Sequence, residues 1–407
     1  MASSKILAAL DIGTSKITAL VGEMDQEGKM YVIGHGVTPS EGLRRGVVVD
    51  MEKAVNSVRR AVDDAQMVSG TEIDRITVGI SGEHIRSINS HGVVAVNRAD
   101  NEIVRADVDK AIEAARAIAI PVDREIIHVI PQKFSVDEQT DIKDPIGMTG
   151  VRLEVEAHIV TASVTTARNL YRVLERCQLE IDHIVLEALA LSNVLLTSEE
   201  ADMGAVIVDI GGELTNMSVF YDGAIRHTAF IPLGGRNITN DIAIGLRTPV
   251  DKAESLKIAS GAAMASMVDA EEMVEVQAAV GRDPRQISRH VLASIIEPRM
   301  EEIFSLVLRE IRRLGMTETP AAGVILTGGA SIMPGCTALA EQILDMPVRD
   351  GEVVGWEHIP DELTNNRFAA ALGLLCYSFQ NEPVKASRSS NMRGFVKKFE
   401  NWISRKF

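Results

Sequence analysis

The chain has 407 residues, 46% of them apolar, and a formal net charge of −15. That length favours two or more domains, and the negative charge argues against a general nucleic-acid binder, whose affinity depends on basic residues that neutralise phosphates. The three cysteines, Cys177, Cys336 and Cys376, lack metal-ligand spacing, so neither a disulfide nor a zinc site is expected. Neither an export signal nor an apolar run of membrane-spanning length is recognisable.

The first predicted element is a β-hairpin over residues 6–24, ILAALDIGTSKITALVGEM. Two apolar runs flank a turn of Gly, Thr, Ser and Lys, a pattern typical of paired strands. Residues 205–223, AVIVDIGGELTNMSVFYDG, repeat this arrangement, and both turns contain Asp-Ile-Gly. A strand that runs into glycines follows each hairpin, ITVGISG at 76–82 and GVILTGGAS at 323–331. The chain is therefore predicted to be a diverged duplication, with two related domains facing each other.

Helical patterns between these strands indicate α/β layers. Residues 51–70 place apolar side chains at helical spacing, and a glycine ends the run. Residues 84–163 have no counterpart in the second half, so we interpret them as an inserted α+β domain. Within the insert, the strictly alternating segment 151–160 predicts a half-buried strand, and residues 107–120 predict a helix capped by Asp107.

The hairpin turns offer the groups that a polyphosphate requires. Residues 11–16 would present backbone N–H groups, two hydroxyls and an ammonium, and Gly13 would let a ligand approach the backbone closely. Asp11 and Asp209, one from each hairpin, would hold Mg²⁺ through its waters. The Gly-Gly-Ala sequence at 328–330 would give adenine a side-chain-free surface. Each turn alone is more often an ordinary turn, so the prediction of ATP and Mg²⁺ depends on their repetition in the same order.

Further segments resemble the FtsA family of bacterial cell-division proteins, within the actin, Hsp70 and sugar-kinase superfamily. The resemblance covers nearly the whole chain. Its most specific mark is DPIGMTGVRLE, because this segment lies in the insert, where the family carries a domain of its own. The segments that resemble the family are DIGTSK (11–16), GLRRGVVVD (42–50), GISGEHIRSINSHG (79–92), DPIGMTGVRLE (144–154), IRHTAFIPLGG (225–235), AESLK (253–257) and TGGAS (327–331).

The resemblance implies an α/β protein with a duplicated actin-like (ribonuclease H-like) fold. Two large lobes would surround a nucleotide cleft, with an inserted small α+β domain and a C-terminal amphipathic helix. The expected parts are a first lobe at 1–83, 164–195 and 358–379, the insert at 84–163, a second lobe at 196–225 and 301–357, an outer small lobe at 226–300, a flexible linker at 380–391 and the amphipathic helix at 392–407.

The resemblance also implies a nucleotide site, without naming a catalytic residue. Carried over by motif, phosphate would be bound by Asp11, Gly13, Thr14, Ser15 and Lys16. The second hairpin and the segment after it would contribute Asp209, Gly211, Gly212, Gly234 and Gly235. The ribose and base edge would be bound by Glu254 and Lys257, and the adenosine by Gly328, Gly329 and Ala330.

The second hairpin departs from the family pattern at its turn. The family usually has Asp-Ile-Gly-Gly-Gly-Thr followed one residue later by Asp, whereas this chain has Glu213 in place of the last glycine and Asn216 in place of the final Asp. A carboxylate there would repel the terminal phosphate unless it turned outward or bound the metal. We therefore expect ATP binding with at most weak hydrolysis; a Glu213 that simply points to solvent is the open alternative.

The last sixteen residues, MRGFVKKFENWISRKF, reverse the polarity of the chain, since they hold five basic residues and the single acid Glu400. On a helix the apolar side chains would span an arc of about 140°. Such a helix lies in the headgroup plane of an anionic bilayer, bound reversibly at about 1 kcal/mol per basic residue; docking on the protein's own core is the alternative. The predicted membrane residues are Phe395, Val396, Lys397, Lys398, Phe399, Trp402, Ile403, Arg405, Lys406 and Phe407.

The resemblance implies an ATP-binding adaptor that self-assembles and helps recruit later division proteins. It would hold the tubulin-like ring protein FtsZ at the cytoplasmic face of the inner membrane, at the division site. The FtsZ C-terminal peptide would bind the outer small lobe, with the helix predicted over residues 287–304 as a candidate surface. Arg289 and Arg299 would be available to an acidic peptide, unless they pair with neighbours such as Glu297 and Glu301.

Two other functions within the same superfamily stay open. A small-molecule kinase would need a carboxylate base for a substrate hydroxyl, and no residue outside the nucleotide motifs indicates one. A relative of the pilus-assembly protein PilM would capture a partner's N-terminal peptide, and would lack the terminal amphipathic helix predicted here.

Overall fold

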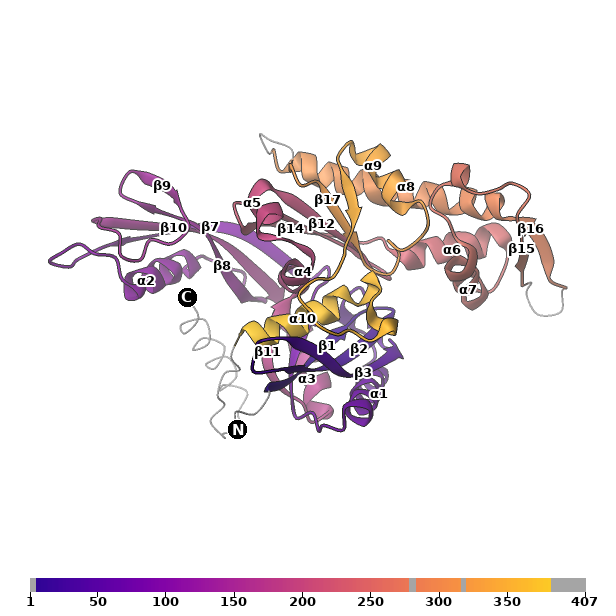
Figure 1. The fold of residues 1–407 in the computed structure, drawn as a ribbon, viewed down its shortest axis with the longest axis horizontal. Coiled ribbons are helices and arrows are strands. Elements are labelled where there is room, and N and C mark those ends of the chain that lie inside the picture. The colour runs from indigo at the N-terminus through magenta and orange to yellow at the C-terminus, as the bar shows by residue number, and fades with distance from the viewer. Residues whose placement is uncertain (1–4, 278–282, 316–319, 382–407) are drawn as a thin grey trace.

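The computed structural model describes residues 5–277, 283–315 and 320–381. Two five-stranded mixed sheets form the centres of two lobes (Figure 1). The sheet of the first lobe has the order β11-β6-β1-β2-β3. Its strands are β1 (Lys5–Ile12), β2 (Lys16–Met24), β3 (Met30–Pro39), β6 (Arg75–Ile80) and β11 (Glu180–Leu186), and a small hairpin, β4 (Leu43–Arg44) and β5 (Val47–Val48), lies outside it.

The sheet of the second lobe has the order β14-β13-β12-β17-β18, which repeats the topology of the first. In each sheet a hairpin is followed by a third antiparallel strand on one side, and the first strand pairs in parallel with a later strand on the other side. The predicted duplication is therefore confirmed. The strands are β12 (Ala205–Ile210), β13 (Thr215–Tyr221), β14 (Ala224–Ile231), β17 (Val324–Thr327) and β18 (Val348–Asp350).

Helices cover the first sheet on both faces. They are α1 (Met51–Ser69), α3 (Val164–Arg176), α4 (Glu187–Leu195) and α10 (Ala369–Gln380). The predicted helix at 51–70 is confirmed as α1: Asp50 caps its start by accepting the Lys53 N–H, and Gly70 ends it with a φ of 66°. Its buried residues recur at helical spacing and face β3, where a side chain at Gly36 would meet the Ala61 carbonyl oxygen at 2.0 Å.

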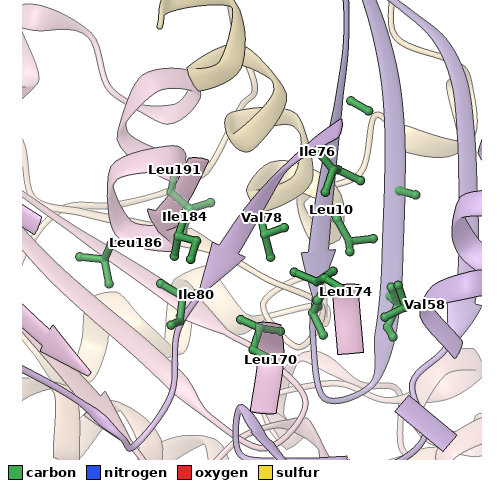
Figure 2. Close-up of a cluster of buried hydrophobic side chains, with 14 of the residues drawn as sticks. Leu10, Val58, Ile76, Val78, Ile80, Leu170, Leu174, Ile184, Leu186 and Leu191 are labelled. Atoms are coloured by element: carbon green, nitrogen blue, oxygen red, sulfur yellow. The ribbon is translucent and has the colours of Figure 1, made fainter. Parts of the chain in front are cut away.

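The core of the first lobe lies between the sheet and these helices (Figure 2). Leu10, Ile76 and Val78 come from the central strands, and Leu170 and Leu174 from α3. All but Leu170 are fully buried, and each buried aliphatic side chain of this kind contributes about 1.5 to 3 kcal/mol. These contacts hold β1 in place, so the turn after Ile12 starts from a rigid strand.

The chain returns to the first lobe at its C-terminal end. Helix α10 packs on α4 and on the strands β1, β2 and β6; Leu375 fits over Gly22 of β2, and Leu374 over Gly79 of β6. Two 3₁₀ turns, Asp361–Leu363 and Asn366–Phe368, precede it.

The insert forms a separate sheet of order β7-β10-β8-β9, with α2 on one face (Figure 1). Its elements are β7 (Ile85–Ala95), α2 (Arg105–Arg116), β8 (Arg124–Val136), β9 (Gln139–Ile142) and β10 (Arg152–Ser163). The predicted strand at 151–160 is confirmed within β10. The predicted helix is shorter than 107–120, and Asp107 is not its N-cap residue but lies at its third position, where its carboxylate accepts the N–H of Val104.

The insert also contacts the second lobe, although the chain enters and leaves it from the first. The Gln132 side chain donates to the Ile225 carbonyl oxygen at 2.7 Å, and the Thr228 hydroxyl donates to Ser87 at 2.9 Å. The Lys143 ammonium pairs with Asp202 at 2.7 Å. The insert is therefore a bridge between the two lobes.

Helices and a small hairpin extend the second lobe away from the insert (Figure 1). We call α6, α7, the β15–β16 hairpin and the first half of α8 the outer region. Two predicted boundaries fall inside continuous elements: 225/226 lies within β14 and 300/301 within α8. The elements of this half are α5 (Ser198–Met203), α6 (Gly235–Leu246), α7 (Val250–Ser260), the 3₁₀ turn Ala265–Met267, β15 (Met273–Val276), β16 (Arg285–Ser288), α8 (Arg289–Arg313) and α9 (Cys336–Leu344).

The predicted amphipathic helix at 392–407, with all ten proposed membrane residues, lies outside the described residues, as does most of the predicted linker. Within the described part of the chain, no helix combines the length and the apolar character needed to span a bilayer.

Candidate functional site

The turns of the two predicted phosphate hairpins meet at the interface of the lobes. A side chain at Gly212, in the turn between β12 and β13, would lie 3.0 Å from the Ser15 Cβ and 3.2 Å from the Thr14 hydroxyl. The space around Gly13 is similarly small, because a Cβ there would lie 2.9 Å from the Lys16 carbonyl oxygen. Glycines at these positions therefore let two backbones approach one small volume.

Two carboxylates lie beneath these turns, the buried Asp11 and the half-buried Asp209. Burial raises the pKa of Asp11, and the Lys16 ammonium, 3.7 Å from its carboxylate, opposes that rise. Burial also raises the pKa of Asp209, to about 6; the Asn216 amide opposes this rise and the charge of Asp11 adds to it. Two poorly solvated acids with one nearby ammonium form a site that favours an added cation.

A third acid, Glu187, was missed by the sequence analysis. It is the first residue of α4, and burial raises its pKa to about 8, with further contributions from the charges of Asp11 and Asp209. The Asn216 amide nitrogen donates to Asp209 at 3.0 Å and to Glu187 at 3.4 Å. A signal was present in the sequence, since Glu187 is a lone carboxylate within the apolar run IVLEALAL.

A small cavity adjoins this acidic cluster. Its lining includes Ser81, Glu187, Asn216 and Ser218, and it has room for about one water molecule. The amide oxygen of Asn216 is buried and has no hydrogen-bond partner among the described residues. A bound water would satisfy it.

The glycines of the second lobe pack around the second turn. The N–H of Gly235, at the start of α6, donates to the Gly211 carbonyl oxygen at 2.9 Å. A side chain at Gly234 would lie 2.7 Å from the same oxygen. Gly328 has a φ of +89°, and a Cβ there would lie 2.3 Å from the Asp209 carboxylate, so no other residue fits this position without movement.

The residues predicted to bind ribose and adenosine also come together. The Lys257 ammonium donates to the Gly235 carbonyl oxygen at 3.1 Å, to Thr239 at 2.9 Å and to Glu254 at 2.7 Å. Burial lowers the pKa of Lys257, and Glu254 opposes this shift. A Cβ at Gly235 would lie 3.4 Å from that of Ala330. Lys257 thus connects α7 to the first turn of α6, whose Gly235 N–H is bonded to Gly211 of the second hairpin turn.

Two residues near the predicted adenosine surface were not predicted. The Lys16 ammonium lies 5.1 Å from the centre of the Phe368 ring, and the Arg367 guanidinium 4.6 Å from it. A side chain at Gly329 would come within 4.0 Å of the Arg367 Cβ. No local sequence pattern predicts that Arg367 and Phe368 belong to the site. They lie beside Lys16 and Gly329 only because the chain returns to the first lobe after β18.

Glu213 points neither to open solvent nor to the carboxylates. Its side chain is 16% exposed, one oxygen accepts the backbone N–H of Arg45 at 2.9 Å, and the other lies 3.7 Å from the Arg236 guanidinium. Arg45 belongs to the β4–β5 hairpin of the first lobe. The alternative of a solvent-pointing side chain is therefore wrong, and the side chain instead reaches from the second lobe to the first.

Arg289 and Arg299 lie in the outer region, away from this site. Arg289 pairs with Glu272 at 2.8 Å and donates to the Ser260 carbonyl oxygen. Arg299 donates twice to Asp241, at 2.7 and 3.0 Å, and also contacts Glu302. Both arginines are thus paired, but with partners other than the predicted Glu297 and Glu301.

The groups present fit a nucleotide, and a metal ion held through water. Glycines let the two turns approach closely, and Lys16, Lys257 and Arg367 supply cations. The Asn216 oxygen has no hydrogen-bond partner among the described residues. In the described residues, no group of three or more His, Cys, Asp or Glu side chains is arranged to hold a metal directly. Asp11 and Asp209 would therefore act on Mg²⁺ through its waters.

The repeated sheets, with their hairpin turns meeting between two lobes, define an actin-like protein. The fold resembles a solved PilM–PilN type IV pilus biogenesis complex, with a TM-score of 0.68 at 16% identity over 92% of this chain and 99% of that one. It also resembles MreB5 of Spiroplasma citri bound to AMPPNP, with a TM-score of 0.56 at 14% identity over 98% and 99% of the two chains. At these identities the likeness shows the fold alone.

The sequence comparisons identify the family. The profile described as "Cell division protein FtsA" matches residues 206–373, and the one described as "SHS2 domain inserted in FTSA" matches residues 82–161. Cell division protein FtsA of Pseudomonas aeruginosa is 44% identical over 95% of this chain and 92% of its own length. That of Neisseria meningitidis serogroup B is 42% identical over 99% of both. The chain belongs to the FtsA family of cell division proteins.

Proposed function

We propose that this protein binds Mg-ATP between its lobes and works as an adaptor of cell division with at most weak ATPase activity. The observation that carries the nucleotide proposal is the meeting of the two glycine turns above the carboxylates of Asp11 and Asp209. An anionic ligand with its own Mg²⁺ would bring positive charge to these acids and negative charge to Lys16.

The remaining groups have distinct roles in this proposal. Lys16 and the backbone of the turn at 13–15 would bind phosphate, as would Gly211 and Gly212. Lys257 and Glu254 would bind the ribose and base edge, and Gly328 to Ala330 would lie against the adenosine. In the nucleotide-free protein, burial raises the pKa of Glu187 to about 8, so this acid stays largely protonated near neutral pH.

Calorimetry with Mg-ATP tests the nucleotide site. We expect Asp209→Ala to weaken binding by about 100-fold, or about 2.7 kcal/mol. A matched control is Asp202→Ala, which removes an exposed carboxylate of the same lobe that pairs with Lys143. Equal affinities for the wild type and Asp209→Ala would refute the proposed site.

We further propose that the protein assembles with itself and tethers the FtsZ C-terminal peptide to the membrane, where later division proteins join. Family membership supports this role. The outer region also exposes apolar side chains that a peptide could cover, with Ile244 77%, Ile258 74% and Val291 46% exposed. Because Arg289 and Arg299 are already paired, they would have to exchange partners to bind an acidic peptide.

Fluorescence anisotropy of a labelled FtsZ C-terminal peptide tests the partner. If the outer region is the site, Ile258→Glu should reduce peptide affinity at least tenfold, or about 1.4 kcal/mol. Met67→Glu is the matched control, because Met67 is 82% exposed at the end of α1, in the first lobe. Equal loss in both variants would contradict a site on the outer region.

We propose that residues 392–407 hold the protein at the cytoplasmic face of the inner membrane, at the division site. The support is the amphipathic sequence pattern with its five basic residues. Co-sedimentation with anionic liposomes, with and without Mg-ATP, tests this for the full chain and for a truncation after Asn391. Trp402→Glu in the full chain is the matched point variant. Pelleting of the truncation to the same extent as the full chain would refute the membrane helix.

A further inference from the structure

Glu213 makes a polar contact between the lobes at the phosphate end of the proposed nucleotide site. Its carboxylate accepts the N–H of Arg45 at 2.9 Å, and its side chain is 16% exposed. A carboxylate that accepts a backbone N–H in a half-buried place forms a charge-assisted hydrogen bond, which is about twice as strong as a neutral one. Glu213 therefore adds directly to the closed arrangement of the hairpin turns.

The backbone of Arg45, the donor in this contact, is held in place by a tight turn. Arg45 has a φ of 48° in the left-handed region, and Gly46 follows with a φ of 75°. The Arg45 guanidinium reaches Glu83 at 3.1 Å, in the loop that leads from β6 into the insert. The Arg45 N–H is thus aimed at Glu213 by a tight turn that is anchored at the base of the insert.

Three residues of this hairpin depart from the family pattern, Glu213, Leu214 in place of threonine, and Asn216, and the two that change charge form one rearrangement. Glu213 supplies a carboxylate where a glycine is usual, and Asn216 removes one where Asp is usual. Asn216 donates to both Asp209 and Glu187, which a carboxylate could not do because it only accepts. Compared with the family pattern, this hairpin therefore lacks one negative charge at its base, at position 216, and has an additional one in its turn, at position 213. The terminal phosphate of a triphosphate would lie at this turn.

We propose that Glu213 is a specificity determinant that makes the site favour a nucleoside diphosphate over the triphosphate. This inference rests on the proposed nucleotide site. With a diphosphate bound, Glu213 keeps its bond to Arg45 and the lobes stay tied. A third phosphate places like charge beside the Glu213 carboxylate, so binding it costs either repulsion or the loss of the contact with Arg45. Arg236, at 3.7 Å, neutralises only part of this charge because its side chain is 60% exposed.

The test compares ATP and ADP affinities of the full chain, each with Mg²⁺, by calorimetry. Glu213→Gln removes the charge and keeps an oxygen that can accept the Arg45 N–H. We expect it to bind ATP about tenfold more tightly than the wild type, about 1.4 kcal/mol, with ADP affinity changed less than about twofold. Glu83→Gln is the matched control, because it removes the other acid that contacts Arg45 and should leave the ATP to ADP ratio unchanged.

Hydrogen exchange at the Arg45 amide provides a readout that does not require nucleotide turnover. In the nucleotide-free protein, the Arg45 amide should exchange faster in Glu213→Ala than in the wild type, because its acceptor is lost. In Glu213→Gln its exchange should stay slow, because the glutamine oxygen still accepts the N–H. In the wild type, Mg-ATP should speed its exchange relative to Mg-ADP.

The outcomes separate this inference from the proposed function. A wild type that binds neither nucleotide overturns both. A wild type that binds both, with an unchanged ratio in Glu213→Gln, overturns the specificity role alone and leaves Glu213 as a structural contact. A shifted ratio in Glu213→Gln and also in Glu83→Gln would assign the effect to Arg45 rather than to the carboxylate at position 213.

Discussion

Glu187 gives the sharpest stability prediction of the structure. It is a buried acid whose pKa is raised to about 8 from an ordinary value of 4.5, mainly by burial and then by the charges of Asp11 and Asp209. A raised pKa means that the folded protein binds this proton more tightly than the unfolded chain does. The resulting stabilisation is complete below the unfolded value and is lost as the pH rises through the folded value.

The size of the effect follows from these two pKa values. Between about pH 6 and about pH 8, the unfolded chain has already lost this proton while the folded protein still holds much of it, so the unfolding free energy falls by about 2 kcal/mol. Asp209, with a pKa of about 6, changes mostly below this window. The window therefore isolates Glu187 from its neighbour.

The assay is urea unfolding of the nucleotide-free protein in a chelator, at several pH values. Across the window, the unfolding free energy of the wild type should fall by about 2 kcal/mol relative to that of Glu187→Gln, because glutamine has no proton to lose. Buried histidines such as His84 and His158, whose pKa burial lowers to about 4, change the stability of both proteins equally and cancel in this comparison. Glu199→Gln, at an exposed position, is the control and should follow the wild type. Parallel pH profiles for the wild type and Glu187→Gln would refute the assignment of the raised pKa to Glu187.

Three other variants test the packing that shapes the site. Gly328→Ala should lower stability by at least about 2 kcal/mol, because its φ is +89° and the new Cβ would meet Asp209 at 2.3 Å; an unchanged melting temperature would contradict that geometry. Leu375→Ala should cost about 2 to 5 kcal/mol in urea unfolding, since it empties the buried space over Gly22, whereas exposed Val354→Ala should be nearly neutral. Gln132→Ala leaves the Ile225 carbonyl oxygen unpaired, so hydrogen exchange in β14 should rise; unchanged exchange there would show that the insert is held by its other contacts.

The sequence allowed the fold class and the two hairpin turns of the candidate site to be predicted because both depend on local patterns. Each hairpin has apolar strands that flank a turn rich in glycine, and this pattern occurs twice in the same order. Strand pairing and strand order then confirmed the duplication. Glycine positions were informative because close backbone approach excludes other residues, as at Gly212 and Gly234.

The remaining parts depend on contacts between distant segments. Arg367 and Phe368 reach the site only because the chain crosses back to the first lobe, and no pattern within that segment predicts this. The pairing of Arg289 with Glu272 and of Arg299 with Asp241 joins residues from different elements, so the predicted partners, chosen from the same helix, were wrong. The orientation of the Glu213 side chain depends on Arg45 in the other lobe, and the linear sequence does not show that the two residues lie close together.

The two ends of the proposed nucleotide site differ in how the lobes are joined. At the base end, the connection from the second lobe to the first is bonded along its length. Gly351 donates to Leu326 at 2.7 Å, Val354 donates to Val194 at 3.0 Å, and Thr327 donates to Asn366 at 3.2 Å. Around the hairpin turns, the described residues join the lobes through the close approach of the glycine turns and through two hydrogen bonds, from Arg45 to Glu213 and from Asn216 to Glu187. A change at the phosphate end, such as one phosphate more or fewer, would therefore act on these few contacts, and the insert, which contacts both lobes, would receive any resulting movement.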